Sequence, residues 1–313
     1  MLSRIADSLF WLNRYMERCD GLLRVVHTNY ILSFDKSPYG VHSWRPVLQI
    51  FTFADEKQMA ELEFQTADTL KYLVLDTGNM NSLKVIINRA RENARGIQDN
   101  ITKEVWEQVN QMYHQVNNNK LERTLAGNNV LTVIDQFIEN ALLYTGVTDS
   151  TMPRGMSWSF MNLGKYIERC LITIEMVDKN FQSLEYNLDN SRDILYWRNL
   201  LLSLSGYELH LKTYRSTDYN HNVAHQVLFN KDFTRSIIYS LERIKRYLED
   251  VVDENKPAGK EQLEKNFGRL YSQVQYADFE LINQLSLQKF LAQVRTELLN
   301  FAKQLGQTFF SYS

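Results

Sequence analysis

The stretch LNRYMERC at residues 12–19 decides the fold, because a related stretch, LGKYIERC, stands 151 positions later at residues 163–170. Around both stretches apolar residues recur at spacings of three and four, which is typical of the buried face of a helix. The copies also have a glutamate–arginine pair and a cysteine in common. The chain therefore repeats a helical segment that carries charged side chains as well as a hydrophobic pattern.

Two further matches follow in the same order. WRPVL at residues 44–48 returns as WRNLL at residues 197–201, with an offset of 153. A serine followed by two basic residues also returns with an offset of 154, so that Ser82, Arg89 and Arg91 become Ser236, Arg243 and Lys245. Three matches with an almost constant offset indicate a duplicated helical unit. We predict two tandem, pseudo-symmetric helical repeats, residues 1–150 and 151–313, packed as one globular unit.

The sequence pattern indicates helices along the whole chain. Its 313 residues include only 12 glycines and 4 prolines, and alternating patterns of the kind that strands show are hard to find. We predict an all-α bundle of about ten or more helices, with a linker over residues 147–155 and a solvated loop over 253–260. Beyond the long opening helix, the expected helices begin after Trp44-Arg45-Pro46 and after the N-caps Ser82 and Thr102, and lie near 56–66, 67–75, 128–145, 157–181, 191–214, 219–230, 236–254, 260–276 and 284–310.

Charge and hydropathy exclude several classes of partner. A net charge of −2 offers no general attraction to nucleic acid or to an anionic membrane. The aromatic residues follow helical seams and form no basic stacking platform, and no apolar run approaches the ~20 residues that span a bilayer. We expect no nucleic-acid partner, no membrane association and, because the start lacks the features of a signal peptide, a cytoplasmic location.

Familiar catalytic and metal motifs are absent from the sequence. It contains no glycine-rich phosphate loop and no His-Glu-x-x-His, Cys-x-x-Cys, Glu-x-x-His or Gly-x-Ser-x-Gly. His221 and His225 stand four residues apart on an expected helix, but no third metal ligand lies near them in the sequence. We predict neither a metal nor a cofactor, and we interpret Cys19 and Cys170 as reduced thiols of the core.

Clusters of arginine and glutamate are the strongest candidates for a site. Arg14, Glu17 and Arg18 fall on one helix face, and the second copy repeats that spacing with lysine in the first position. Guanidinium groups bind carboxylate or phosphate through paired hydrogen bonds, so converging clusters would form an anion or carboxylate site. The ligand-binding candidates are Arg14, Glu17, Arg18, Arg91, Glu92, Arg95, Arg154, Lys165, Glu168 and Arg169.

Two other interpretations of these clusters stay open. Arginine–glutamate networks also fix the register of packed helices without binding any ligand. Alternatively, Glu17, Glu92 or Glu168 would act as a general acid or base of a hydrolase or transferase, beside arginines that stabilise negative charge. The tryptophans of the repeated motif, Trp44 and Trp197, are interpreted as packing anchors at helix starts.

Five segments carry a family resemblance. They are SRIADSLFWLNRYMER at residues 3–18, ARENAR at 90–95, LGKYIER at 163–169 and, more weakly, SGYE at 205–208 and DFTRS at 232–236. With them the chain resembles the bacterial alpha-E domain family over essentially its whole length. It departs from the family pattern at Asn13, where glycine is expected, at Pro153, where threonine is usual, and at Lys165, which replaces an arginine.

The resemblance implies an all-helical protein with particular partners. Members of the family are associated with a circularly permuted ATP-grasp ligase and with transglutaminase-like proteins, in systems that make or process peptide or amide bonds. The leading hypothesis is therefore an accessory helical protein that binds a partner enzyme or a carboxylate-bearing small molecule or peptide through its arginine–glutamate clusters. The alternatives are the enzyme described above and a purely structural interaction scaffold.

Overall fold

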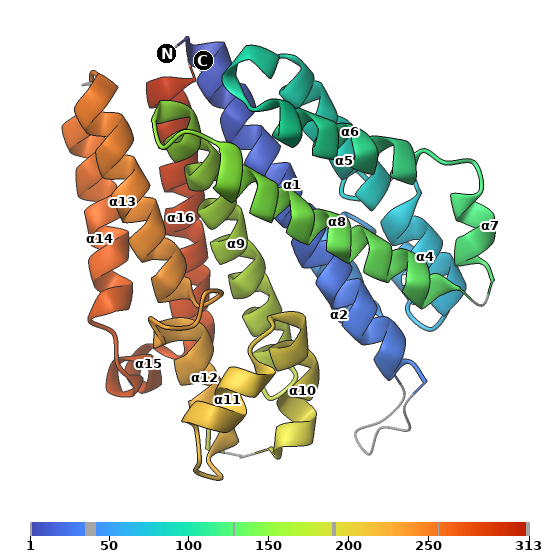
Figure 1. Ribbon diagram of the computed structural model, residues 1–313. Coiled ribbons are helices and arrows are strands. Elements are labelled where there is room, and N and C mark those ends of the chain that lie inside the picture. Colours follow the sequence, from blue (N-terminus) through green and yellow to red (C-terminus); the bar gives the residue numbers. More distant parts are fainter. Residues whose placement is uncertain (1, 35–41, 128, 190–191, 256, 311–313) are drawn as a thin grey trace. The chain divides into compact units, whose positions relative to one another are not determined.

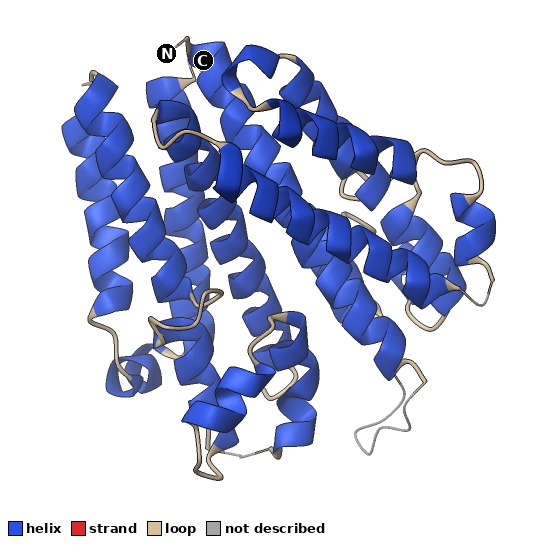
Figure 2. Ribbon diagram, in the orientation of Figure 1, coloured by secondary structure: helices blue, strands red, loops and turns tan. Residues whose placement is uncertain are grey.

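The computed structural model describes residues 2–34, 42–127, 129–189, 192–255 and 257–310, and in these residues every regular element is a helix (Figure 2). The predicted all-α class is therefore confirmed. The chain divides into two compact units. We call residues 11–153 the N-terminal unit and residues 1–10 with 154–313 the C-terminal unit. The pseudo-symmetry of the two repeats stays a prediction.

The N-terminal unit contains most of the long first helix. The apolar seam predicted for this helix from Leu2 to Tyr30 is buried in its middle, from Leu9 to Val26, whereas Leu2 is 70% exposed and Ile5 and Tyr30 are half-buried. Later in the unit, α5 packs on α6 and α6 packs on α8. The helices of this part (Figure 1) are α1 Ser3–Leu32, α2 Arg45–Phe51, α3 Glu56–Leu62, α4 Thr66–Val74, α5 Leu83–Arg95, α6 Lys103–Val116, α7 Leu121–Leu125 and α8 Val130–Thr151, with a short 3-10 helix at Gln98–Asn100.

Both N-caps predicted in this unit are confirmed. The hydroxyl of Ser82 accepts a hydrogen bond from the backbone N–H of Val85 at the start of α5. The hydroxyl of Thr102 does the same for Val105 at the start of α6. Each cap satisfies an N–H group that has no partner within its helix. The 3-10 helix Gln98–Asn100 separates these two helices.

The C-terminal unit contains a closed ring of four helices. Helix α9 packs on α13, α13 on α14, α14 on α16, and α16 again on α9. The shorter helices α10, α11, α12 and α15 lie at one end of this four-helix bundle (Figure 1). The helices are α9 Met156–Gln182, α10 Ile194–Ser203, α11 Tyr207–Thr213, α12 Tyr219–Phe229, α13 Ile237–Asn255, α14 Lys260–Gln275, α15 Phe279–Leu285 and α16 Leu287–Phe309.

A group of phenylalanine rings joins the beginning and the end of the chain within the C-terminal unit. The ring centroid of Phe10 lies 5.1 Å from that of Phe310. Phe160 of α9 contacts both Phe309 and Phe310, at 5.5 and 5.9 Å. These rings are buried, so the first turns of α1 belong to the core of this unit.

None of the described helices combines the length and the apolar character that crossing a bilayer requires.

The linker predicted over residues 147–155 is shorter than expected. Helix α8 continues to Thr151, because no helix-breaking residue precedes Pro153. Met152 ends the helix with extended backbone angles, φ −71° and ψ 129°. A residue before proline is disfavoured in the helical region by contact with the proline ring, which explains the position of this end.

The single helix predicted over residues 191–214 is two helices, α10 and α11. The break passes through Ser205, which has a positive φ of 55°, and Gly206. A Cβ atom on Gly206 would lie 2.6 Å from Nε2 of Gln226 and 2.7 Å from Cζ of Phe233. A side chain at position 206 would therefore have to displace these atoms, while the left-handed backbone of Ser205 interrupts the helix.

One further helix end, one helix division and one short helix differ from the prediction. Helix α13 continues to Asn255, two residues into the loop predicted from residue 253. The helix predicted near 284–310 is divided by Ser286, whose φ of 72° ends α15 and whose hydroxyl caps α16 by accepting from the N–H of Lys289. Helix α7 was not predicted at all, since its five residues are too short for periodicity to be visible.

Candidate functional site

The glutamate–arginine pair of α1 lies in the N-terminal unit on a largely buried helix face. The side chains of Arg14 and Glu17 are buried, with 9% and 5% of their surface exposed. The guanidinium carbon of Arg14 lies 4.7 Å from the ring centroid of Trp11. Arg18 donates a hydrogen bond of 2.8 Å to Oδ1 of Asn81, in the loop before α5. The face that carries these charges is therefore not a solvated outer face.

The equivalent pair of α9 lies in the C-terminal unit. Glu168 is buried, with 3% of its surface exposed. Arg169 donates to the backbone carbonyl of Thr234 at 3.4 Å, and its guanidinium carbon lies 5.2 Å from the ring centroid of Tyr166. The ammonium of Lys165 lies 5.8 Å from the same ring. Lys165 and Arg169 thus both lie beside the ring of Tyr166.

The two arginines take similar local positions in their own units. Arg18 reaches the residue before the capping Ser82, and Arg169 reaches a residue two before Ser236. Ser236 caps α13 by accepting a hydrogen bond from the N–H of Tyr239 at 3.1 Å. In each unit, an arginine of the long helix therefore holds the loop that leads into a serine-capped helix.

Three tyrosines and one arginine lie close to one another in the C-terminal unit. We call them the phenol cluster: Tyr166, Tyr239, Tyr247 and Arg243. Tyr166 lies 6.2 Å from Tyr239 and stacks on Tyr247 at 6.1 Å, measured between ring centroids. Arg243 donates a hydrogen bond of 3.1 Å to the Tyr239 hydroxyl and lies 4.8 Å from its ring. Burial raises the pKa of Tyr166 to about 12, so its phenol stays neutral and able to donate a hydrogen bond.

The setting of Arg243 is unusual for a partly buried arginine. Within the described part of the chain no carboxylate pairs with it, and its polar partner is the neutral hydroxyl of Tyr239. Buried charges in proteins are normally paired with an opposite charge. Arg243 therefore departs from this usual pairing among the described residues.

The N-terminal unit has a smaller version of this arrangement. The guanidinium carbon of Arg89, the counterpart of Arg243, lies 6.0 Å from the ring of Tyr15, the counterpart of Tyr166. Arg89 also contacts the sulfur of Met80 at 3.7 Å. An arginine thus lies beside the tyrosine of the repeated motif in each unit.

The third predicted cluster lies on the surface of the N-terminal unit. Glu92 and Arg95 expose 55% and 61% of their side chains and pair at 2.9 Å, while Arg91 contacts Glu92 at 3.3 Å. Arg91 also donates to Asn110 of α6 at 2.8 Å and lies 4.3 Å from the ring of Tyr113. The cluster therefore links α5 to α6 and does not enclose a buried space for a ligand.

The remaining candidate cation, Arg154, lies at the start of the C-terminal unit. Its guanidinium carbon is 3.7 Å from the ring centroid of Trp158, one turn into α9. Of the candidates in the C-terminal unit, Lys165 and Arg169 lie around the phenol cluster. Sequence reasoning noted Arg243 only as an echo of Arg89 and missed Tyr239 and Tyr247, although all three follow a spacing of four along α13.

His221 and His225 each contact a nearby side chain, and Cys19 and Cys170 are reduced thiols of the core, as interpreted. His221 contacts Asp218 at 3.0 Å, and His225 contacts the Tyr214 hydroxyl at 2.7 Å. No group of three or more metal-binding side chains occurs among the described residues. Both cysteines are buried, unpaired thiols, and burial raises the pKa of each, so they do not act as reactive thiolates.

The repeated tryptophans are packing anchors, as predicted. Trp44 and Trp197 expose 1% and 0% of their surface. The indole N–H of Trp44 donates to the hydroxyl of Thr66 at 3.1 Å. That of Trp197 donates to Oδ1 of Asn220 at 2.9 Å. Each therefore fixes the start of a helix against a partner about 22 residues further along the chain.

Comparison with known proteins gives two mycobacterial relatives. The chain is similar to an uncharacterized protein of Mycobacterium bovis and to an uncharacterized protein of Mycobacterium tuberculosis, each 23% identical in an alignment of 268 positions that covers 79% of this chain and 30% of the relative. The chain thus corresponds to less than a third of the length of these relatives. No solved structure matches it.

A family model settles the relationship. The Alpha-E model, described as a predicted alpha-helical domain with a conserved ER motif, matches residues 1–310. The glutamate–arginine pairs at residues 17–18 and 168–169 are of the type that this description names. Helices are the only regular elements in the described part of the chain, in agreement with that description. The chain therefore belongs to the Alpha-E family.

Proposed function

We propose that this Alpha-E chain is an accessory, non-catalytic protein of an ATP-grasp-linked system that forms peptide or amide bonds. In this proposal it binds a partner enzyme or a carboxylate-bearing substrate through its arginine–glutamate clusters. The observation that carries the proposal is the setting of Arg243, whose guanidinium is held by a phenol hydroxyl and lacks a carboxylate partner among the described residues.

The surroundings of Arg243 suit an anionic group. Tyr166 and Tyr239 supply phenol hydroxyls, and Arg169 supplies a second guanidinium beside Tyr166. Hydrogen bonds between a guanidinium and a carboxylate are about twice as strong as neutral ones and are directional. A carboxylate of a substrate, or of an acidic side chain on a partner, would supply the opposite charge that the described residues do not place beside Arg243.

The lengths of the relatives support a role beside other protein parts. In both mycobacterial proteins the region similar to this chain makes up 30% of the length, so most of each relative lies outside the match. A helical segment that is joined to further sequence in one organism is a reasonable candidate for association with a separate protein in another.

A structural scaffold remains a second candidate for the third cluster. Arg91 is satisfied by Asn110, Glu92 and the ring of Tyr113, and Glu92 is shared with Arg95. These groups pair with one another and bridge two helices of the same unit. We propose that this cluster stabilises the contact of α5 with α6 and takes no part in ligand binding.

Titration calorimetry tests the proposal with two probes: the circularly permuted ATP-grasp ligase of the same genome, and glutarate as a simple dicarboxylate. We expect binding of at least one probe, weakened by about fivefold or more in Arg243→Gln, since a hydrogen bond to a charged group is lost. Arg123→Gln, on the exposed side of α7, is the control and is expected to bind as the parent does. No heat with either probe, in a folded sample, contradicts the proposal.

A further inference from the structure

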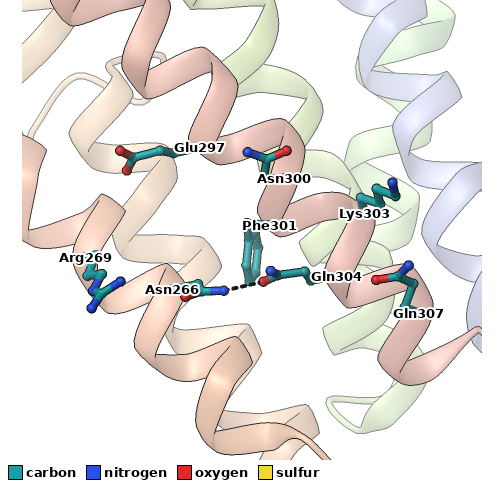
Figure 3. A pocket seen from close by; sticks show the side chains of 8 residues that line it. All are labelled: Asn266, Arg269, Glu297, Asn300, Phe301, Lys303, Gln304 and Gln307. Atoms are coloured by element: carbon teal, nitrogen blue, oxygen red, sulfur yellow. Dashed lines mark hydrogen bonds between the residues drawn. The ribbon is translucent and has the colours of Figure 1, made fainter.

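A polar groove lies between α14 and α16 of the C-terminal unit (Figure 3). It has a volume of about 460 Å³. Its walls are rich in carboxamides, and its floor includes Phe301, whose side chain is 1% exposed. The lining residues are Asn266, Arg269, Glu297, Asn300, Phe301, Lys303, Gln304 and Gln307. None of them belongs to the phenol cluster, so the groove is a separate feature.

The carboxamides of the groove are partly organised by one another. Asn266 donates a hydrogen bond of 2.8 Å to Oε1 of Gln304, which crosses the groove from α14 to α16 (Figure 3). Oδ1 of Asn266 in turn accepts from Gln262 at 2.7 Å. This chain leaves the NH₂ group of Gln304 as a donor with a fixed position. Asn300 and Gln307 add further donors and acceptors on the same helix.

Two cations of the groove have no ion pair. Within the described residues, neither Arg269 nor Lys303 lies within 4.0 Å of a carboxylate oxygen. They lie on opposite sides of the Asn266–Gln304 pair (Figure 3). Two cations placed in this way do not converge on one compact anion. They suit a ligand with negative groups set apart along its length.

The single acid of the groove is already partly occupied. Glu297 accepts a hydrogen bond of 3.0 Å from Nε2 of Gln293. Arg269 and Lys303 are both positive, so the lining as a whole carries a net charge of one positive unit. The amide of Gln273 also donates to both oxygens of Glu297, at 3.1 and 3.2 Å, so this acid is held by the protein itself.

We propose that this groove binds a short acidic peptide in an extended conformation. Arg269 and Lys303 would pair with two acidic side chains, while Gln304, Asn300 and Gln307 would bond to the peptide backbone. The lining of α16 runs from residue 297 to residue 307, about 15 Å at ~1.5 Å per residue. An extended segment of about five residues has this length at ~3.3 Å per residue.

The composition of the lining favours a peptide over other polar ligands. Sugars and nucleobases are usually held by stacking on an aromatic face. The aromatic ring of the lining, Phe301, is buried beneath its neighbours and offers no such face. Carboxamides, in contrast, can donate to and accept from the alternating groups of a peptide backbone.

Fluorescence anisotropy with labelled pentapeptides tests this inference on the full chain. The probes are Glu-Ala-Glu-Ala-Glu, whose carboxylates point to one side when extended, and the matched Gln-Ala-Gln-Ala-Gln. We expect the acidic peptide to bind at least about tenfold more tightly than the neutral one, because two charge-assisted hydrogen bonds are involved. Inorganic phosphate at the same charge concentration is expected not to displace it.

Matched variants locate the binding. Arg269→Gln and Lys303→Gln are each expected to weaken the acidic peptide about fivefold or more. Lys265→Gln, an exposed lysine of α14 outside the groove, is expected to change binding less than twofold. Equal binding of both peptides, displacement by phosphate, an equal loss in Lys265→Gln, or no binding by a folded chain would each overturn the inference. Because glutarate binding at Arg243 is measured separately, either proposal can fail without the other.

Discussion

The hydroxyl of Tyr144 in α8 donates a hydrogen bond of 2.5 Å to Oδ1 of Asn13 in α1, and both side chains are buried. Asn13 stands where the family pattern leads one to expect glycine, and its counterpart in the second copy is Gly164. This bond forms a polar tie between α1 and the last helix of the N-terminal unit. Burial raises the pKa of Tyr144, so the phenol remains a donor at all ordinary pH values.

Replacing Tyr144 by phenylalanine is expected to lower the free energy of unfolding by about 1–3 kcal/mol, since Oδ1 of Asn13 is left buried without its donor. Chemical denaturation measures this change. Tyr276→Phe is the control, because Tyr276 is 76% exposed, and should differ from the parent by less than ~0.5 kcal/mol. An equal effect of the two substitutions would show that the buried bond contributes nothing.

Gly206→Ala is expected to destabilise the chain by about 1–3 kcal/mol, because the added methyl would overlap Gln226 and Phe233. Gly268→Ala is the matched comparison, since a Cβ on Gly268 meets nothing within 4 Å and the residue lies inside α14. There alanine should stabilise by about 0.5–1 kcal/mol. Thermal melts of the two variants should thus shift in opposite directions, and shifts of the same sign would contradict the geometry at Gly206.

Arg18→Ala is expected to lower the free energy of unfolding by more than about 1 kcal/mol, because the bond that holds the loop before α5 at Asn81 is lost. Arg95→Ala removes a guanidinium that is 61% exposed and pairs on the surface, and should cost less than ~0.5 kcal/mol. Urea denaturation of both variants checks the difference. If Arg18→Ala unfolds at the same urea concentration as the parent, the stability of the fold does not depend on this bond to the loop.

Acid is expected to weaken the fold in part through His210. This residue is fully buried, and burial lowers its pKa below the ordinary 6.5. As the pH falls below about 6.5 the unfolded chain takes up a proton that folded His210 resists, so stability is present above that pH and decreases below it. In His210→Asn, whose amide can replace the Nδ1–H that contacts Gln226, the decrease between pH 7.5 and 5.5 should be smaller. Unfolding curves at the two pH values give the comparison, and an identical decrease would exclude a contribution from His210.

Much of the fold could be predicted because its causes are local. Periodicity in the opening helix and in α9 was visible over many turns, and the capping residues Ser82 and Thr102 act on N–H groups three residues away. The burial of Trp44 and Trp197 followed from their place in a repeated apolar motif. Such features depend on neighbours in the sequence, which can be read without coordinates.

The parts that escaped prediction depend on packing between distant segments. The need for glycine at position 206 comes from Gln226 and Phe233, which stand 20 residues or more further along. The phenol cluster forms only because α9 packs against α13 and brings Tyr166 to Tyr239. The charged clusters were identifiable as helix faces, but only contacts showed that Arg91 pairs on the surface while Glu168 is buried.

The ring contact between Phe10 and Phe310 has a practical consequence for dissecting the molecule. A fragment that starts at Arg154 would lack the opening turns that fill its own interior, although it holds every other helix of its unit. Expressed alone, such a fragment should leave Phe160 and Phe310 uncovered and be prone to aggregate. Supplying the first ten residues, as a fused or added peptide, should restore its solubility.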